Sequence, residues 1–135
     1  MAAFQQCDRE IIAQTLDWLE HPRHHLLNFG SPAYPERLRS IANFPVILFV
    51  QGDPDLLLTP QIAIVGSRNC SHYGRNWGTF FAQALALNGI TITSGLATGI
   101  DGVAHRAALE VGGKTLAVLG SGLAHIYPRR HCSLA

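Results

Sequence analysis

Residues 62–74, "IAIVGSRNCSHYG", contain the pattern that decides the fold. The apolar run "IAIV" ends at Gly66, and a hydroxyl and a guanidinium follow at once in Ser67 and Arg68. A short apolar run closed by a glycine is typical of a buried strand. Glycine lets the backbone approach a ligand closely, and the planar donors of arginine match phosphate oxygens. The stretch therefore predicts a strand followed by an anion-binding corner.

The order strand, glycine, helix occurs three times from residue 61 onward. The expected strands are "IAIVG", "ITITSG" and "TLAVLGSG", whose glycine corners are Gly66, Gly95 and Gly120. Each helix between them is expected to bury one face on the sheet. These faces are Trp77, Phe80, Phe81, Ala84 and Leu85 in the first helix, and Val103, Ala104, Ala107, Ala108 and Val111 in the second. The alternation predicts an α/β fold, a Rossmann-like parallel sheet with helices on both faces.

Residues 1–60 have a different pattern and predict a small helical lead-in with one short strand, "PVILFVQGD". Asp8 is expected to cap the first helix, and Pro35 to lie in the first turn of the second. The expected division is therefore 1–60 and 61–135, the latter being the first half of a Rossmann-like domain. Three parallel strands leave a sheet edge uncovered, so we expect a fragment of a longer protein or a completing partner.

Composition limits the classes of function. The chain has 135 residues, of which 47% are hydrophobic and 14% charged, with a net charge of +1. Any nucleic-acid binding must therefore come from a local basic patch. No apolar run approaches the roughly 20 residues of a membrane span. Three separated cysteines and an N-terminus without signal-peptide character predict a cytoplasmic protein with reduced thiols.

The glycine corners are expected to share one edge of the sheet, where ligands bind. Helix N-termini add partial positive charge there, and Ser67 and Ser94 add hydroxyl donors. A plain turn glycine and a helix-entry serine remain alternative explanations. Arg68 is harder to explain without an anion, because a cation near a helix N-terminus is unfavourable. In "SGLATGID", Asp101 is expected to cap the next helix and His105 to pack against the loop.

Familiar catalytic and cofactor motifs are absent from the sequence. It contains no GxGxxG, no GxxxxGK[ST], no HExxH and no GxSxG. No acidic residue ends the second strand to hold a ribose, which disfavours a dehydrogenase. The histidines lack metal-ligand spacing, and His21, His24 and His25 are expected in a solvated loop. We therefore predict no catalytic residue, no metal and no cofactor.

Several motifs resemble a known family. They are "YPERL", "PVILFVQGD", "IAIVGSRNCSHYG", "SGLATGIDGVAH" and "TLAVLGSGLAHIYP", in this order over residues 34–135. Together they resemble the DNA-processing protein A family, also called DprA or Smf. The lead-in "LDWLEHPRHHLL" is most similar to enterobacterial members.

The resemblance implies an extended Rossmann fold that binds single-stranded DNA and is not an enzyme. It also implies a homodimer in the full-length protein, a role in natural transformation and recombination, and help in loading the RecA recombinase. In the family the "GSR" loop contacts DNA phosphate, which assigns that role to Gly66, Ser67 and Arg68. The "SGxAxGID" loop lines the same pocket. This assigns the lining to Ser94, Gly95 and Gly99.

The chain lacks a part of the family pattern. The family continues into an "FPxRN" segment with further basic and aromatic DNA contacts. Within the chain the nearby aromatic candidates for base stacking are Tyr73, Trp77 and Tyr127, with Trp77 expected in the core instead. We expect residues 1–135 alone to bind DNA more weakly than the full-length parent.

Two other functions remain open from the sequence. Nucleotide N-glycosidases of the lysine-decarboxylase-like group share a similar Rossmann variant, but they need a "PGGxGTxxE" corner. The stretch "VLGSGLAH" has the glycines without the threonine and the glutamate. A pocket that senses a free nucleotide is the third hypothesis.

Overall fold

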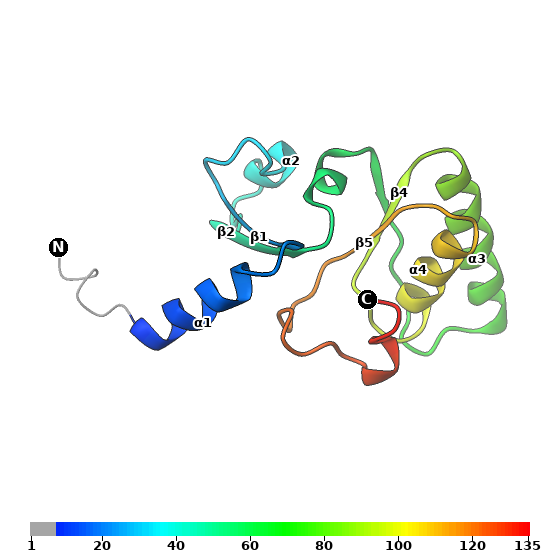
Figure 1. Cartoon of the computed structure of the whole chain (residues 1–135). Coiled ribbons are helices and arrows are strands. Elements are labelled where there is room, and N and C mark those ends of the chain that lie inside the picture. Colours follow the sequence, from blue (N-terminus) through cyan, green and yellow to red (C-terminus); the bar gives the residue numbers. More distant parts are fainter. Residues whose placement is uncertain (1–7) are drawn as a thin grey trace. The chain divides into compact units, whose positions relative to one another are not determined.

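The structure, a computed structural model, describes residues 8–135 (Figure 1). The chain divides into two compact units, Met1–Asp55 and Leu56–Ala135. A short 3-10 helix, η2 (Pro54–Leu58), spans the junction. The boundary expected after residue 60 stays a prediction, because compactness alone does not show which segment folds independently.

The first unit combines two helices with a two-stranded antiparallel sheet. Asp8 caps the first helix as predicted, since its carboxylate accepts hydrogen bonds from the N–H groups of Glu10 and Ile11. In the sheet, Leu26 lies opposite Phe49. The elements are α1 (Arg9–Leu19), β1 (His24–Asn28), α2 (Glu36–Arg39) and β2 (Ile47–Gln51).

Strand β1 corrects the expectation of a histidine loop. His24 and His25 belong to this strand and pair with Gln51 and Val50 of β2. The ring of His24 stacks on Trp18 with a centroid distance of 4.1 Å. Its Nδ1 also lies 2.7 Å from the Trp18 carbonyl oxygen. Ring stacking and strand pairing therefore hold His24 and His25 in β1, although this part of the sequence lacks the alternation of apolar and polar residues typical of a strand.

The second unit is built on a parallel sheet with strand order β3-β4-β5. In register, Ile62 lies opposite Ile92, and Ile92 lies opposite Thr115. The predicted α/β class is confirmed, although the strands are shorter than the apolar runs suggested. The elements are β3 (Gln61–Ala63), α3 (His72–Leu87), β4 (Thr91–Ser94), α4 (Ile100–Glu110), β5 (Thr115–Ala117) and the 3-10 helix η3 (Arg129–His131).

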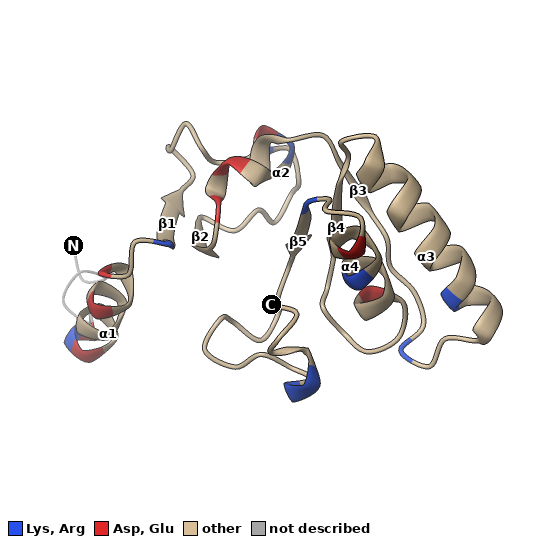
Figure 2. Ribbon diagram, turned by 45° about the vertical axis from the view of Figure 1, so that its right-hand side comes forward, with Lys and Arg blue, Asp and Glu red and all other residues tan. Residues whose placement is uncertain are grey.

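Helices α3 and α4 lie side by side against the sheet in both views (Figures 1 and 2). Strands that neighbour each other in chain order, joined by right-handed crossovers, place their helices on the same face. Within the described residues, the sequence between β3 and β5 therefore covers one face of the sheet rather than both. No helix in this part of the chain is long and apolar enough to cross a membrane.

Small side chains form the contact between α3 and α4. On α3 the buried residues are Gly78, Ala82 and Ala86. The predicted small face of α4 is confirmed, because Ala104 and Ala108 are fully buried against them. Small residues let two helix backbones approach closely, so that dispersion contacts are made along their length.

The predicted packing face of α3 is wrong in its aromatic part. Trp77, Phe80 and Phe81 are 44%, 57% and 52% exposed. The helix instead turns its glycine and alanine face toward α4, because only small residues fit between two closely spaced helices. Trp77 is therefore a surface residue and not a core residue.

His105 lies in the core with a defined tautomer. Its Nδ1 is 2.6 Å from Oγ1 of Thr115, and that hydroxyl donates to the carbonyl of Ile92. Since the hydroxyl proton is used on Ile92, Nδ1 must be the donor to Oγ1. The lone pair is then on Nε2, which is buried without a hydrogen-bond partner among the described residues.

The surroundings of His105 keep the ring neutral. Burial lowers the pKa of His105, and the nearby Asp101 carboxylate opposes this effect. The electrostatic effects of the neighbouring His131 and Arg106 lower the pKa of His105 further. Below the ordinary histidine pKa of about 6.5, the unfolded chain therefore binds a proton that the folded chain does not.

The first prediction concerns Gly113, which follows the turn after α4. A methyl group in Gly113→Ala would lie 2.5 Å from Cβ of Ala86 and 3.0 Å from the carbonyl oxygen of Ala108. We expect this overpacking to lower the free energy of unfolding by about 1–3 kcal/mol, measured by denaturant unfolding. Gly120→Ala is the matched control, because a Cβ there meets no atom within 4 Å. Equal stabilities of the two variants would contradict the close packing of α3 on α4.

The second prediction concerns pH. Because folding lowers the pKa of His105, stability should fall as the pH drops below about 6.5, by up to about 1.4 kcal/mol per pH unit, until the folded-state pKa is reached. In His105→Asn this contribution should be absent, whereas it should persist in the control variant His125→Asn, which changes an exposed ring. Denaturant unfolding at several pH values measures both slopes. Identical pH slopes in wild type and His105→Asn would refute the assignment.

Candidate functional site

Two loops of the second unit meet at the carboxyl ends of β3 and β4. The N–H of Ile100 donates to the carbonyl of Ser67 at 3.2 Å, and the Thr98 hydroxyl donates to the carbonyl of Arg68 at 3.2 Å. Gly99 has φ of +80°, and a Cβ on it would collide with the carbonyl oxygens of Ser67 and Arg68. Only glycine therefore permits the "GSR" corner and the "SGLATGID" loop to touch.

Two of the three corner glycines, Gly66 and Gly95, are also explained by packing, whereas a Cβ on Gly120 would meet no atom within 4 Å. A Cβ on Gly66 would lie 2.8 Å from a side-chain carbon of Ile100, and one on Gly95 would lie 2.9 Å from Oδ2 of Asp101. Asp101 is not the cap that the sequence suggested, since α4 begins one residue earlier at Ile100. Its carboxylate accepts instead from the loop N–H of Ala97 at 3.3 Å.

Both predicted hydroxyl donors have partners within the protein. Oγ of Ser67 accepts from the N–H of Asn69 at 3.1 Å. The hydroxyl of Ser94 is buried and donates to the carbonyl of Ile64 at 2.6 Å. Ser94 therefore stabilises the junction of β3 and β4. In the first turn of α4, the N–H groups of Ile100 and Gly102 are paired with loop carbonyls.

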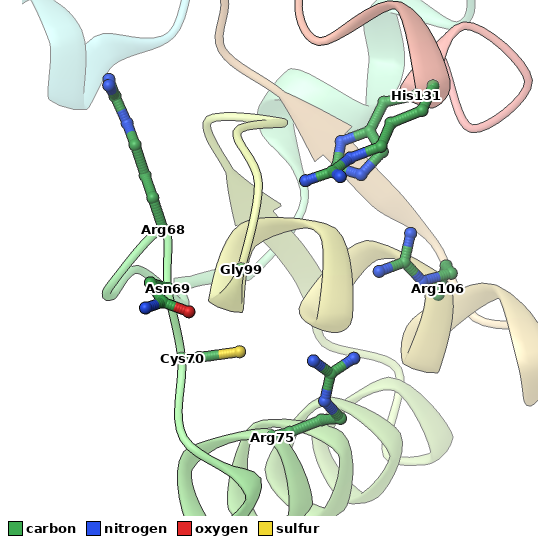
Figure 3. Close-up of a pocket in the computed structure, with 8 residues that line it drawn as sticks. Arg68, Asn69, Cys70, Arg75, Gly99, Arg106 and His131 are labelled. Carbon is green, nitrogen blue, oxygen red and sulfur yellow. The ribbon is translucent and has the colours of Figure 1, made fainter.

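Arginine side chains supply the positive charge of the site. A cavity of about 410 Å³ beside the two loops contains no acidic residue in its lining (Figure 3). We call it the arginine pocket. Four arginines from four different segments line it, the "GSR" corner, α3, α4 and η3, and all four are exposed. The lining residues are Arg68, Asn69, Cys70, Arg75, Gly99, Arg106, Arg130 and His131.

The arginines do not all point the same way. In Figure 3 the side chains of Arg75 and Arg106 are on the same side of the view, whereas the guanidinium of Arg68 lies on the other side and points away from both. Within residues 8–135 the structure records no hydrogen bond and no ion pair of the Arg68 side chain. Arg68 is thus at the rim of the pocket with its charge uncompensated.

A buried histidine fixes the last segment of the pocket. His131 is 3% exposed, and its Nδ1 donates to the carbonyl of Leu96 at 2.8 Å. A Cβ on Gly102 would lie 2.6 Å from Cε1 of this ring, so glycine is needed beneath it. The segment that carries this ring forms the 3-10 turn η3. The turn brings Arg130 into the pocket.

The sequence identified Arg68 and Gly99, but it missed Arg75, Arg106 and Arg130. A partial signal was present, because Arg75 and Arg130 have no acidic residue three or four positions away, whereas Arg106 is followed four positions later on the same helix by Glu110. Among the described residues, no group of three or more His, Cys, Asp or Glu side chains could hold a metal ion.

Comparison with known proteins gives consistent results. The family model described as DNA recombination-mediator protein A matches residues 25–135. Protein Smf of Escherichia coli K12 is 52% identical over 132 residues, which are 98% of this chain and 35% of that protein. The DNA processing protein DprA of Streptococcus pneumoniae R6 is 50% identical over 96 residues, 71% of this chain and 34% of that protein. The chain thus spans about a third of the length of these relatives.

Solved structures agree with the sequence comparison. The X-ray structure of DprA from Streptococcus pneumoniae superposes with a TM-score of 0.83 and 40% identity, over 97% of this chain and 44% of that one. A structure of DNA processing protein A from Helicobacter pylori, which describes its single-stranded DNA binding mode, gives 0.69 and 31% over 84% and 50%. These names denote DNA processing and recombination mediation, not an enzymatic reaction. On the match of its sequence and of its fold, the chain belongs to the DNA recombination-mediator protein A family.

Proposed function

We propose that the chain binds single-stranded DNA in the arginine pocket. We further propose that this binding has a role in DNA uptake and recombination in the cytoplasm. The observation that carries this proposal is the convergence of four exposed arginines on one cavity without an acidic residue in its lining. Like charges gathered in this way repel one another until an anion binds. Nucleic-acid phosphate is the anion that arginine clusters recognise with paired hydrogen bonds.

The relatives favour single-stranded DNA over other polyanions. DprA of Helicobacter pylori is described by its single-stranded DNA binding, and its fold matches 84% of this chain. The position of the Arg68 guanidinium also favours a strand over a free nucleotide. It is separated from Arg75 and Arg106, so that phosphates can bind at more than one place (Figure 3). Successive phosphates of one strand can occupy such places together, and a mononucleotide cannot.

The predicted loop residues divide into two roles in this proposal. Arg68 contacts a phosphate at the rim, with Gly66 and Ser67 shaping the corner that presents it. Ser94, Gly95 and Gly99 act by holding the two loops together, since their atoms are packed or paired within the protein. We add Arg75, Arg106 and Arg130 to the proposed phosphate contacts, because they line the same pocket.

Family membership is the basis for a proposal about the partners of the full-length protein. We propose that the full-length protein forms a homodimer and helps to load the RecA recombinase on the bound strand. Single-strand binding precedes such loading, so the arginine pocket would act upstream of both partners. The chain matches about a third of its curated relatives, and the remainder of their length is where these partner contacts are expected.

The test is a salt titration of oligonucleotide binding to Arg75→Ala, Arg106→Ala and Arg68→Ala. Each lost phosphate contact should weaken binding and reduce the slope of log affinity against log salt by about 0.7, the counterion release of one phosphate in a single strand. Fluorescence anisotropy of a labelled oligothymidylate measures both quantities.

Lys114→Ala is the matched control within the same unit. Lys114 is exposed and precedes β5, so it lies at the opposite edge of the sheet from the pocket. Its substitution should leave the salt slope unchanged. Equal slopes in wild type and all three arginine variants would overturn the proposed site. Displacement of the oligonucleotide by an equimolar mononucleotide would instead favour a nucleotide sensor, and release of free base would favour an N-glycosidase.

A further inference from the structure

Helix α3 carries a continuous group of aromatic rings on its surface, formed by Tyr73, Trp77, Phe80 and Phe81. We call it the aromatic face. Tyr73 is 73% exposed, and the other three rings are 44–57% exposed. Neighbouring rings lie with centroids 5.5–6.1 Å apart, some edge to face and some stacked. Exposed aromatic groups of this size are typical of binding surfaces.

The aromatic face does not hold the helix in place. The opposite side of α3, with Gly78, Ala82 and Ala86, makes the contact with α4. Residues four apart on a helix share a face, so Tyr73, Trp77 and Phe81 form one row along the outer side. These rings are not needed for the core, and their exposure has a free-energy cost in the unbound chain.

Charge restricts the partner of this face. Helix α3 contains no acidic residue, and its one Lys or Arg side chain is Arg75. In Figure 2 its ribbon accordingly carries no red and is tan apart from one blue segment. Arg75 lies between Tyr73 and Trp77 in the sequence and lines the arginine pocket, as does Cys70 just before the helix. The aromatic row therefore begins at the end of α3 where anionic phosphate is proposed to bind, with no carboxylate on the helix to repel it.

The dimensions suit a nucleic-acid strand. A rise of 1.5 Å per residue separates successive rings of the row by about 6 Å along the axis, and the row spans about 12 Å. Nucleotides of a stacked strand advance by about 3.4 Å, so the row offers room for more than one base. Flat rings beside a cationic groove are the arrangement by which proteins bind single strands without reading sequence.

We propose that the aromatic face of α3 is a base-stacking surface that continues the path of a single strand from the arginine pocket. This inference rests on the proposed function, since the pocket supplies the phosphate contacts. Bases of the nucleotides that leave the pocket on the α3 side stack on Tyr73 and Trp77. The phosphates of the same nucleotides face solvent, because Arg75 lies on the opposite side of α3 from the aromatic row and contacts only the phosphates inside the pocket.

The experiment compares Trp77→Ala and Tyr73→Ala with wild type, using an oligothymidylate and an abasic oligonucleotide of equal length. Loss of one stacked base should weaken oligothymidylate binding by roughly 5- to 150-fold. The salt slope should not change, because no phosphate contact is lost. Binding of the abasic strand should not change either. Leu87→Ala, an exposed residue at the far end of α3, is the matched control and should bind like wild type.

Tryptophan fluorescence gives a direct second readout, because the chain has two tryptophans, Trp18 and Trp77. Oligothymidylate should quench the emission of wild type and of Trp18→Phe, and the quenching should be lost in Trp77→Phe. In Trp18→Phe all four rings of the aromatic face are retained and Trp77 is the one remaining tryptophan. Quenching in this variant therefore reports stacking on the intact face.

The outcomes separate the two proposals. If Arg75→Ala reduces the salt slope while Trp77→Ala leaves affinity and quenching unchanged, the stacking surface is refuted and the arginine pocket stands. If wild type does not bind the oligonucleotide, both are refuted. If Trp77→Ala instead converts a dimer to a monomer in light scattering with the affinity per protomer unchanged, the face is a contact between copies of the chain, and the stacking proposal fails.

Discussion

The close contact between the "GSR" corner and Gly99 is the constraint on which the site depends. Two connections that follow neighbouring strands share hydrogen bonds through the carbonyls of Ser67 and Arg68. A side chain at Gly99 would separate them, since its Cβ would occupy the positions of those oxygens. The arginine of one connection and the helix that follows the other are thereby brought to one side of the sheet. The small-residue contact between α3 and α4 then sets how far apart Arg75 and Arg106 lie.

The source of positive charge differs from that of glycine-rich nucleotide sites. In such sites, unpaired peptide N–H groups at a helix N-terminus hold the phosphate. In this chain the N–H groups of Ile100 and Gly102 are paired within the loops. Arginines from four segments line the cavity and its rim and supply the positive charge instead. Long arginine side chains can follow a moving strand, whereas fixed peptide dipoles favour one ligand geometry. This difference suits a ligand recognised for its backbone and not for its sequence.

The sequence was sufficient for the fold class and for part of the site. Strand, glycine and helix in repeating order predicted the parallel sheet, and the small face of α4 was predicted correctly. The buried face of α3 was predicted wrongly. The helical spacing of its apolar residues is equally compatible with burial of the aromatic side and of the glycine and alanine side. Side-chain size favoured burying the aromatic side, but the alanines of α4 accept only the small one.

Arg75, Arg106 and Arg130 converge through tertiary packing, which no spacing along the chain encodes. Strand β1 was missed because its sequence, HHLLN, begins with two histidines and does not alternate between apolar and polar residues.

The attachment of η3 has a consequence for how the pocket responds to its ligand. One arginine reaches the cavity only while the ring of His131 stays seated between Leu96 and Gly102. A 3-10 turn of three residues has little cohesion of its own, so it can detach locally without unfolding the sheet. An anion that bridges Arg130 to the helical arginines must then stabilise the seated turn by the same free energy that the turn adds to binding. Binding of an anion in the cavity and attachment of η3 are therefore coupled, and each increases the other.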